Sequence, residues 1–325
     1  MFSLKKTPNE FKSSRKLPIW VQDMEVLTRP TALARLNSAQ IELQLHNCAR
    51  LPSLGSIDRV LRELVNAEQC FTSQVADVIR RDPSMTTRLL RLVNSVYFGL
   101  TLPVTSIEEA VFYLGVRQVR QLAMVTPVVE DLQRFAGKDS FPWHAFWQHC
   151  VGTAILTPEI MGDVQSSQDE TDYVAGLLHD VGKIAMAAVF PAHFEAIYLV
   201  PREGEDLLAV EEELLGMTHC ELGALYLRYH NLPESAVQAA RYHHNPDKAK
   251  THQRYVAAVQ VADLLVRQAG IGHSGNTSPI TGEAWAEAPG WKFLFPGNSK
   301  EEQEIARANL RRSLERLPAI LEGMV

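Results

Sequence analysis

The stretch LLHDVGK, residues 177–183, places a histidine and an aspartate side by side at the end of an apolar run. The apolar residues before it recur at helical spacing, so a helix should carry His179 into the protein interior. Gly182 offers a helix stop, and near a helix end the adjacent side chains of His179 and Asp180 can share one ion. The dipeptide alone also fits a core histidine beside a capping aspartate, because short motifs recur by chance.

Size and composition describe an ordinary globular protein. The chain has 325 residues, of which 46% are hydrophobic and 22% charged, enough for one large domain or two ordinary ones. No run reaches the roughly 18 apolar residues of a membrane span, and Met1–Asn9 resembles no leader, so we expect a cytoplasmic protein. The net charge of -6 gives no general attraction to nucleic acid or to an anionic membrane.

Helical periodicity dominates the chain. Apolar residues over 57–65 follow the spacing of an amphipathic helix, and Asp82-Pro83 breaks a second helix. Thr105 or Ser106 can cap a further helix, with glutamates placed for a capping box, and that helix ends at Leu114-Gly115. No stretch alternates with a period of two, so the sequence predicts an all-α fold.

Composition shifts divide the chain into four predicted parts. Residues 1–44 form an irregular extension, and residues 45–136 form an N-terminal helical lobe. A polar joint near 135–140 leads to the lobe with the histidines, residues 137–269. Residues 270–325 hold an aromatic loop, which we expect to be packed by its own tryptophans, and a closing amphipathic helix. That helix could cover the chain's own core or pair two copies in a homodimer.

The segment 110–124 can be read in two ways. Two helices joined by a Leu-Gly turn, the second bearing Arg117 and Arg120, resemble a helix-turn-helix. The same pattern fits an ordinary helical hairpin with a solvated basic face. Because the arginines are few and the chain is acidic, we expect no DNA binding.

Several histidines and acids share one property, an inward position on a predicted helix. A buried carboxylate needs a partner, and each histidine taken singly is more often a packed core residue. One buried metal centre would satisfy all of them together. The predicted metal ligands are His149, His179, Asp180, His219, His243, His244 and Asp263. Nitrogen and carboxylate ligands without a thiolate suit one or two divalent ions of iron, manganese, zinc or nickel.

The four cysteines predict neither disulfides nor a structural zinc site. They lie far apart with no CxxC pair, which is typical of reduced thiols. Cys150 and Cys220 each adjoin a candidate histidine and could compete as ligands. Since neighbours on a helix diverge, we expect both thiols to point elsewhere.

The candidate metal ligands and several other segments resemble known families. The order of His149, His179-Asp180 and Asp263 resembles the signature of the HD metal-dependent phosphohydrolase superfamily. Further segments, over roughly residues 45–265, are similar to the HDOD domain. They are Leu51-Pro52-Ser53-Leu54, Asp82-Pro83, residues 89–99, Thr105-Ser106-Ile107, Leu114-Gly115, residues 177–183, residues 219–224 and residues 243–246.

The resemblance implies an all-helical, HD-type bundle with an N-terminal helical lobe and a regulatory role in bacterial signalling, through a protein or nucleotide partner. Many such proteins have lost metal ligands, whereas this chain keeps the set. The set also resembles that of the HD-GYP phosphodiesterases. However, residues 245–248 replace the Gly-Tyr-Pro loop after His244, and Ala145 stands where a glutamate is expected. Both departures argue against cyclic-di-GMP hydrolysis and against a third ion.

Two hypotheses of function follow. In the first, the chain is a regulatory module, and the metal or a hydrogen-bonded network makes its scaffold rigid. In the second, it is a metal-dependent phosphohydrolase in which ions activate a water and polarise a phosphoryl oxygen. The predicted catalytic residues are then Asp180, which holds the ions, and Lys183, which would neutralise phosphate charge or orient the nucleophile. Lys183 is equally typical of a surface lysine at a helix terminus.

Overall fold

All regular structure in the described part of the chain is helical. The computed structural model describes residues 33–47, 72–80, 86, 89–90, 93–94, 103–115, 119, 141–162, 171–202, 204–230 and 232–322. Within these ranges there is no strand, so the prediction of an all-α fold is confirmed. None of the described helices is both long and apolar enough to cross a membrane.

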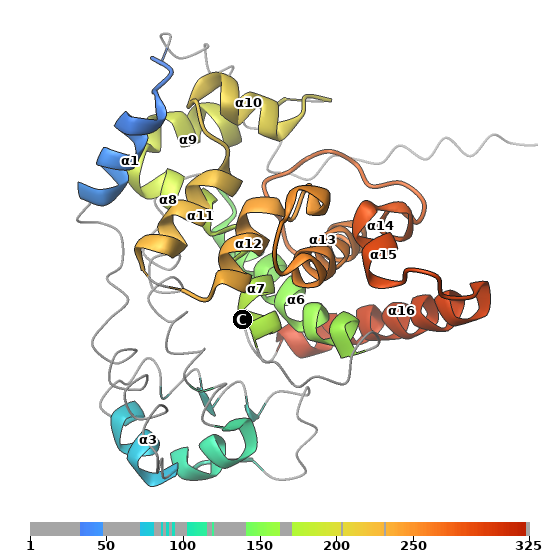
Figure 1. Ribbon diagram of the computed structural model, residues 1–325. Helices are drawn as coiled ribbons and strands as arrows, with labels where there is room; N and C mark the ends of the chain where they lie inside the picture. The colour runs from blue at the N-terminus through green and yellow to red at the C-terminus, as the bar shows by residue number, and fades with distance from the viewer. Residues whose placement is uncertain are drawn as a thin grey trace, which may run out of the picture. The chain divides into compact units, whose positions relative to one another are not determined.

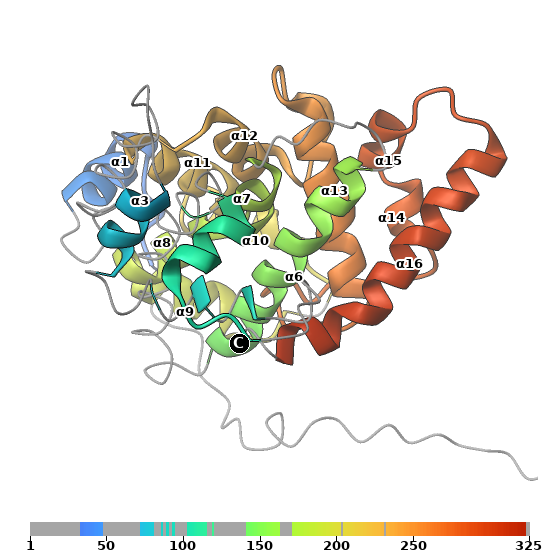
Figure 2. The ribbon, with the colours of Figure 1, turned by 90° about the horizontal axis from the view of Figure 1, so that it is seen from below.

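A large hydrophobic core surrounds α6 (Trp143–Gly162), which is buried along most of its length. The helix α7 (Thr171–Leu178) and the long α13 (Gln253–Gln268) pack against it, and the two ribbon views show all three side by side (Figures 1 and 2). The remaining helices of this core are α1 (Ser38–Asn47), α8 (Val181–Val189), α9 (Pro191–Tyr198), α10 (Leu207–Leu214), α11 (His219–Tyr229), α12 (Glu234–Tyr242), the 3-10 turn η3 (Pro246–Lys248), α14 (Ala284–Glu287), α15 (Pro289–Leu294) and α16 (Lys300–Glu322).

The predicted helix stop at Gly182 is wrong. The chain breaks earlier, at His179 and Asp180, which form the turn between α7 and α8. Gly182 lies in the first turn of α8, where a Cβ atom would come within 1.8 Å of the His219 carbonyl oxygen. The glycine is therefore needed for the close approach of α8 to α11, rather than to end a helix.

A second hydrophobic cluster joins α3 (Thr72–Ile79) to the helical residues 107–115. As predicted, Ser106 caps that helix by accepting a hydrogen bond from the Glu109 amide, and Gly115 ends it at a positive φ of 79°. Outside the described residues lie the helix over 57–65, Asp82-Pro83, Arg117, Arg120 and the joint near 135–140. The boundary at 136/137 therefore stays a prediction.

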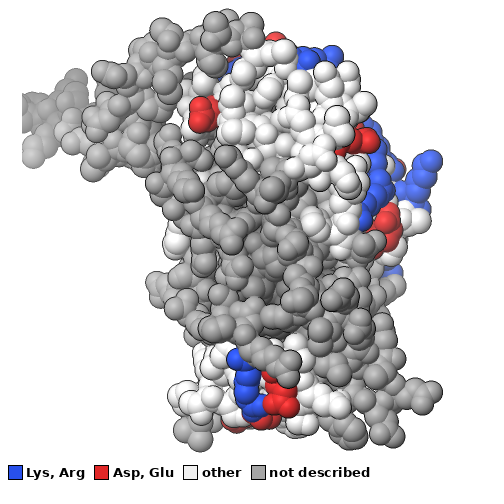
Figure 3. Space-filling model, turned by 90° about the vertical axis from the view of Figure 1, so that its left-hand side faces the viewer, with Lys and Arg blue, Asp and Glu red and all other residues white. Residues whose placement is uncertain are grey.

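The surface of the described residues carries charges of both signs. Arg80 forms ion pairs with Asp77 and Glu108. On the face drawn in Figure 3, basic and acidic side chains of the described residues lie next to one another. In the described part of that face, the basic side chains form no large patch.

The C-terminal part differs from the prediction in one respect. The predicted aromatic loop contains the short helices α14 and α15, whose Trp285 and Trp291 are buried against each other. The closing helix is confirmed as α16, which lies along α6 (Figure 2). Its residues Leu310 and Leu317 are buried in the chain's own core. Pairing of two copies through α16 stays a prediction.

Candidate metal centre

Five structural elements bring the predicted ligands together. The α6 helix carries His149, the turn after α7 carries His179 and Asp180, and α13 carries Asp263. His219 is the first residue of α11, where Thr218 forms a capping box with Glu221. The end of α12 supplies His243 and His244. All seven residues lie in one cluster, and all except the half-buried His244 are at most 4% exposed.

The first group of donor atoms gathers around His149 and His179. Their Nε2 atoms are 3.3 Å apart, a distance at which the two nitrogens can share a proton or an ion. Two nitrogens bonded to one tetrahedral ion at about 2.1 Å would lie about 3.4 Å apart. Asp263 Oδ1 lies 3.2 Å from His149 Nε2, and Asp180 Oδ2 lies 3.4 Å from His179 Nε2. One ligand atom from each of His149, His179 and Asp263 lies within 4.8 Å of the others, which fits one ion, and Asp180 adjoins this group through His179.

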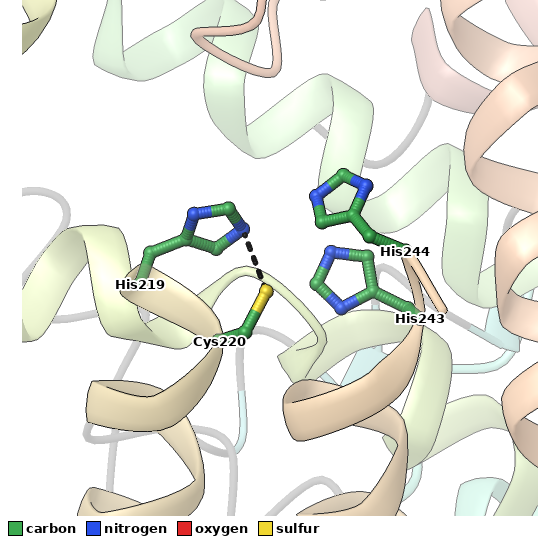
Figure 4. A group of neighbouring side chains, drawn as sticks. All are labelled: His219, Cys220, His243 and His244. Carbon is green, nitrogen blue, oxygen red and sulfur yellow. Dashed lines mark hydrogen bonds between the residues drawn. The ribbon is translucent and has the colours of Figure 1, made fainter. Parts of the chain in front are cut away.

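The second group lies on the other side of Asp180. Its second oxygen, Oδ1, is 3.2 Å from His219 Nε2 and 3.6 Å from His243 Nε2. His244 completes the group, and its ring centroid is 5.3 Å from that of His219 (Figure 4). The two oxygens of Asp180 thus face two sets of imidazoles, so Asp180 could contribute a donor atom to each set.

The capping role considered for Asp180 is wrong. Although Asp180 stands at the N-terminus of α8, its side chain accepts no capping hydrogen bond. Burial by itself would raise the pKa of Asp180, but the Lys183 ammonium and the His179 and His219 imidazoles hold that pKa well below its usual range. Asp180 is therefore an ionised carboxylate, the form that binds cations.

Three of the imidazoles are held in the neutral form. Burial lowers the pKa of His149 despite the opposing effect of Asp263, and burial with neighbouring histidines lowers the pKa of His243 well below its usual range. Burial also lowers the pKa of His244 to about 4. Neutral imidazole is the form that binds metals, so these side chains need lose no proton near neutral pH.

Hydrogen bonds fix the orientation of most of the rings. The Nδ1 atom of His179 lies 2.7 Å from the Gly176 carbonyl oxygen, and that of His243 lies 3.1 Å from the Ala239 carbonyl oxygen. Nδ1 donates in each case, which leaves Nε2 free to face the centre. His149 differs, because its Nδ1 has no hydrogen-bond partner in the described structure.

Glu211 supports His219 and was missed by the sequence analysis. Its fully buried carboxylate accepts hydrogen bonds from the His219 amide and from His219 Nδ1, both at 2.8 Å, and from the Tyr198 hydroxyl. Nothing in the sequence marks it, since it opens a run of three glutamates on an unremarkable helix. A carboxylate behind a histidine ligand raises the basicity of the ring and fixes its tautomer.

Replacing Glu211 with glutamine is expected to weaken metal binding by about 10- to 100-fold, the usual cost of losing such support. The amide cannot act as a charged acceptor for both His219 nitrogens. The measurement is a competition titration of the bound ion against a chromophoric chelator. Glu212→Gln is the control, because that exposed neighbour pairs with Arg35, away from the centre. Equal metal affinities in the two variants would contradict the role of Glu211 as the support of His219.

Lys183 is buried, so its alternative placement on the surface is wrong. The side chain is only 2% exposed; its Nζ donates to Asp180 Oδ2 at 2.6 Å and to the Ser274 carbonyl oxygen at 2.8 Å. The loop that carries Ser274 fits closely on α6, since a Cβ atom at Gly272 would come within 2.2 Å of the Ala145 carbonyl oxygen. Two of the three N–H donors of the ammonium group are thus engaged within the protein.

Comparison with known proteins identifies the family of the chain. Residues 51–246 match the sequence profile of the HDOD domain. A curated protein of Treponema pallidum is 26% identical over 251 residues, which are 76% of this chain but only 46% of that protein, so the chain spans less than half of its relative.

Solved structures share the fold. An HDOD domain protein from Geobacter sulfurreducens superposes with a TM-score of 0.73 at 24% identity, covering 88% of this chain and 99% of that one. A structure from Shewanella amazonensis named "Putative phosphohydrolase" gives 0.65 at 21% identity, covering 87% and 98%. One from Marinobacter aquaeolei named "Putative signal transduction protein" gives 0.64 at 22% identity, covering 90% and 67%. At these identities the likeness establishes the fold alone.

Proposed function

The chain belongs to the HDOD domain family, and from that premise we propose that it is a bacterial signal-transduction module that binds a protein or nucleotide partner. In this proposal a buried metal centre holds its helices in a fixed arrangement. The observation that carries the proposal is the convergence of seven predicted ligand side chains, from five elements, in a site where all but His244 are buried.

The residues present fit a divalent metal. His243 Nε2 and His244 Nε2 have no hydrogen-bond partner within the described structure, and a buried nitrogen left unsatisfied costs about 1–3 kcal/mol. An ion would satisfy both. The first position would be held by His149, His179, Asp180 and Asp263, and the second by Asp180, His219, His243 and His244. Iron, manganese, zinc and nickel all accept such donors.

The closed site favours a structural role for the metal. Every ligand except His244 is nearly inaccessible to water, and Lys183 is already engaged by Asp180 and Ser274. A phosphoester would have to displace the Ser274 carbonyl from the ammonium group before Lys183 could neutralise its charge. A ligand set that joins α6, α7, α11, α12 and α13 would make these helices one rigid unit, as a binding scaffold requires.

One observation favours a phosphohydrolase as the second candidate. The two oxygens of Asp180 face two separate imidazole groups, as in sites that hold two ions. Bound metal would supply an activated water and polarise a phosphoryl oxygen. Asp180 would hold the ions at a fixed separation, and Lys183 would bind the phosphate once freed from Ser274.

Metal content and turnover together test the proposal. The purified chain is expected to contain one or two equivalents of metal by elemental analysis and to hydrolyse neither generic phosphoesters nor cyclic dinucleotides. His149→Ala should lower the metal content by at least one equivalent. His144→Ala is the matched control, because His144 is exposed on the same helix. A chain without metal would refute the proposed centre, whereas turnover that is lost in His149→Ala would favour the hydrolase.

Nucleotide binding is tested separately. Isothermal titration of the metal-loaded chain with cyclic dinucleotides should reveal saturable binding without hydrolysis, if the partner is a nucleotide of that class. Chelation of the metal should then weaken the binding, because the rigid arrangement of the helices is lost. Absence of binding to these ligands leaves a protein as the partner in this proposal.

A further inference from the structure

The thiol of Cys220 lies inside the second group of donor atoms. Its Sγ is 3.4 Å from His219 Nε2, and the side chain is 5% exposed. One ligand atom from each of His219, Cys220, His243 and His244 lies within 4.8 Å of the others. Figure 4 shows the thiol between the His219 ring and the other two rings. The expectation that this cysteine points elsewhere is therefore wrong.

The start of α11 explains how two adjacent residues can face the same point. His219 and Cys220 are the first two residues of the helix, after the Thr218 cap. The Glu211 carboxylate holds the His219 ring by Nδ1 at 2.8 Å, and the opposite nitrogen is thereby turned toward Cys220 Sγ. In a helix without such a tether, two neighbouring side chains would diverge by about 100°.

The separation of the two atoms fits a shared ion. Bonds of about 2.3 Å to sulfur and about 2.1 Å to nitrogen, at a tetrahedral angle, place the two donors about 3.6 Å apart. The observed distance is 3.4 Å. This distance fits two ligands of one metal, and it fits a weak hydrogen bond between the thiol and the imidazole equally well.

An independent observation points to a ligand in the same place. His243, which is 1% exposed, has an Nε2 atom without any hydrogen-bond partner in the described structure, and so does His244. The two rings lie side by side, with centroids 4.1 Å apart. Their unsatisfied nitrogens, together with the thiol, form a set of donors suited to a cation.

We propose that Cys220 binds the second ion as a thiolate, in addition to Asp180 and the nitrogens of His219, His243 and His244. This inference rests on the proposed metal centre and makes its two positions chemically different. The thiol proton is released to solvent when the ion binds. A sulfur ligand favours zinc or cobalt over manganese or magnesium, so the second position should select a thiophilic ion, while the first position keeps nitrogen and oxygen donors.

Cys150 provides a matched control. It is also buried and also adjoins a candidate ligand, His149. However, it belongs to none of the groups of donor atoms found among the described residues. Its replacement by serine should therefore leave the metal positions unchanged.

The test uses the full chain loaded with cobalt(II) after removal of its native metal. The wild-type chain and Cys150→Ser should show the near-ultraviolet charge-transfer absorption of a cobalt thiolate. Cys220→Ser should lose this absorption and bind zinc at the second position at least about tenfold more weakly, while the first position stays loaded. X-ray absorption at the zinc edge of the wild-type chain should detect one sulfur neighbour at about 2.3 Å.

The possible failures are distinguishable. A chain that binds metal without charge-transfer absorption and without a sulfur neighbour would overturn the role of Cys220 but leave the metal centre intact. A chain that binds no metal would overturn both. If Cys220→Ser does not fold, the absorption edge of the wild-type chain still decides, because that measurement needs no variant.

Discussion

Replacing Asp180 with alanine is expected to lower the free energy of unfolding by about 3–5 kcal/mol and to remove metal from both positions. The change leaves the Lys183 ammonium buried without its partner at 2.6 Å, and an uncompensated buried charge is costly. It also removes the carboxylate whose two oxygens face the two imidazole groups. Urea unfolding and elemental analysis measure the two effects.

The double variant Asp180→Ala with Lys183→Met separates the loss of stability from the loss of metal. Without the ammonium group no charge is stranded, so most of the lost stability should return while the metal stays absent. If Asp180→Ala unfolds at the same urea concentration as the metal-free wild-type chain, the ion pair does not stabilise the fold. If that variant keeps both ions, Asp180 is not a shared ligand.

Replacing Gly182 with alanine is expected to cost about 3 kcal/mol, at the upper end for overpacking. The added Cβ would lie 1.8 Å from the His219 carbonyl oxygen and 2.7 Å from the Gly223 amide nitrogen, and both are backbone atoms that cannot rotate away. The strain can be relieved only by moving α8 from α11, which displaces His219 from Asp180. Thermal unfolding and metal titration should therefore both report the change.

Gly162→Ala is the control for this prediction. That glycine also lies in a helix, but a Cβ there would meet nothing within 4 Å, so the change in stability should stay within about 1 kcal/mol. An equal loss of stability in the two variants would mean that the cost does not arise from the close contact between α8 and α11.

The ligand set and the helical fold could be predicted because their signals are local. The spacing of apolar residues places His149 and Asp263 on inward faces of helices, and several inward side chains that can bind metal are informative together. The positions of His219 at the start of a helix and His243 at the end of one could also be predicted, because capping residues and Pro233 mark the helix boundaries.

The supporting residues could not be predicted, since their roles arise between segments far apart in the chain. Glu211 resembles the surface glutamates beside it until α10 packs near α11 and brings it to His219. Lys183 resembles a surface lysine until the loop with Ser274 closes over it. Cys220 lies 3.4 Å from His219 Nε2 because Glu211 turns the His219 ring toward it, and no helical repeat can indicate such a contact.

The sequence by itself determined that this protein is helical and which histidines and aspartates lie on inward faces, because residue type and helical periodicity are properties of each segment. Only the tertiary structure decided that Gly182 serves close packing, that Asp180 lies between two groups of imidazoles, and that Lys183 and Cys220 turn inward. These features depend on distances of a few ångströms between separate helices, which are set by the packing of the whole core.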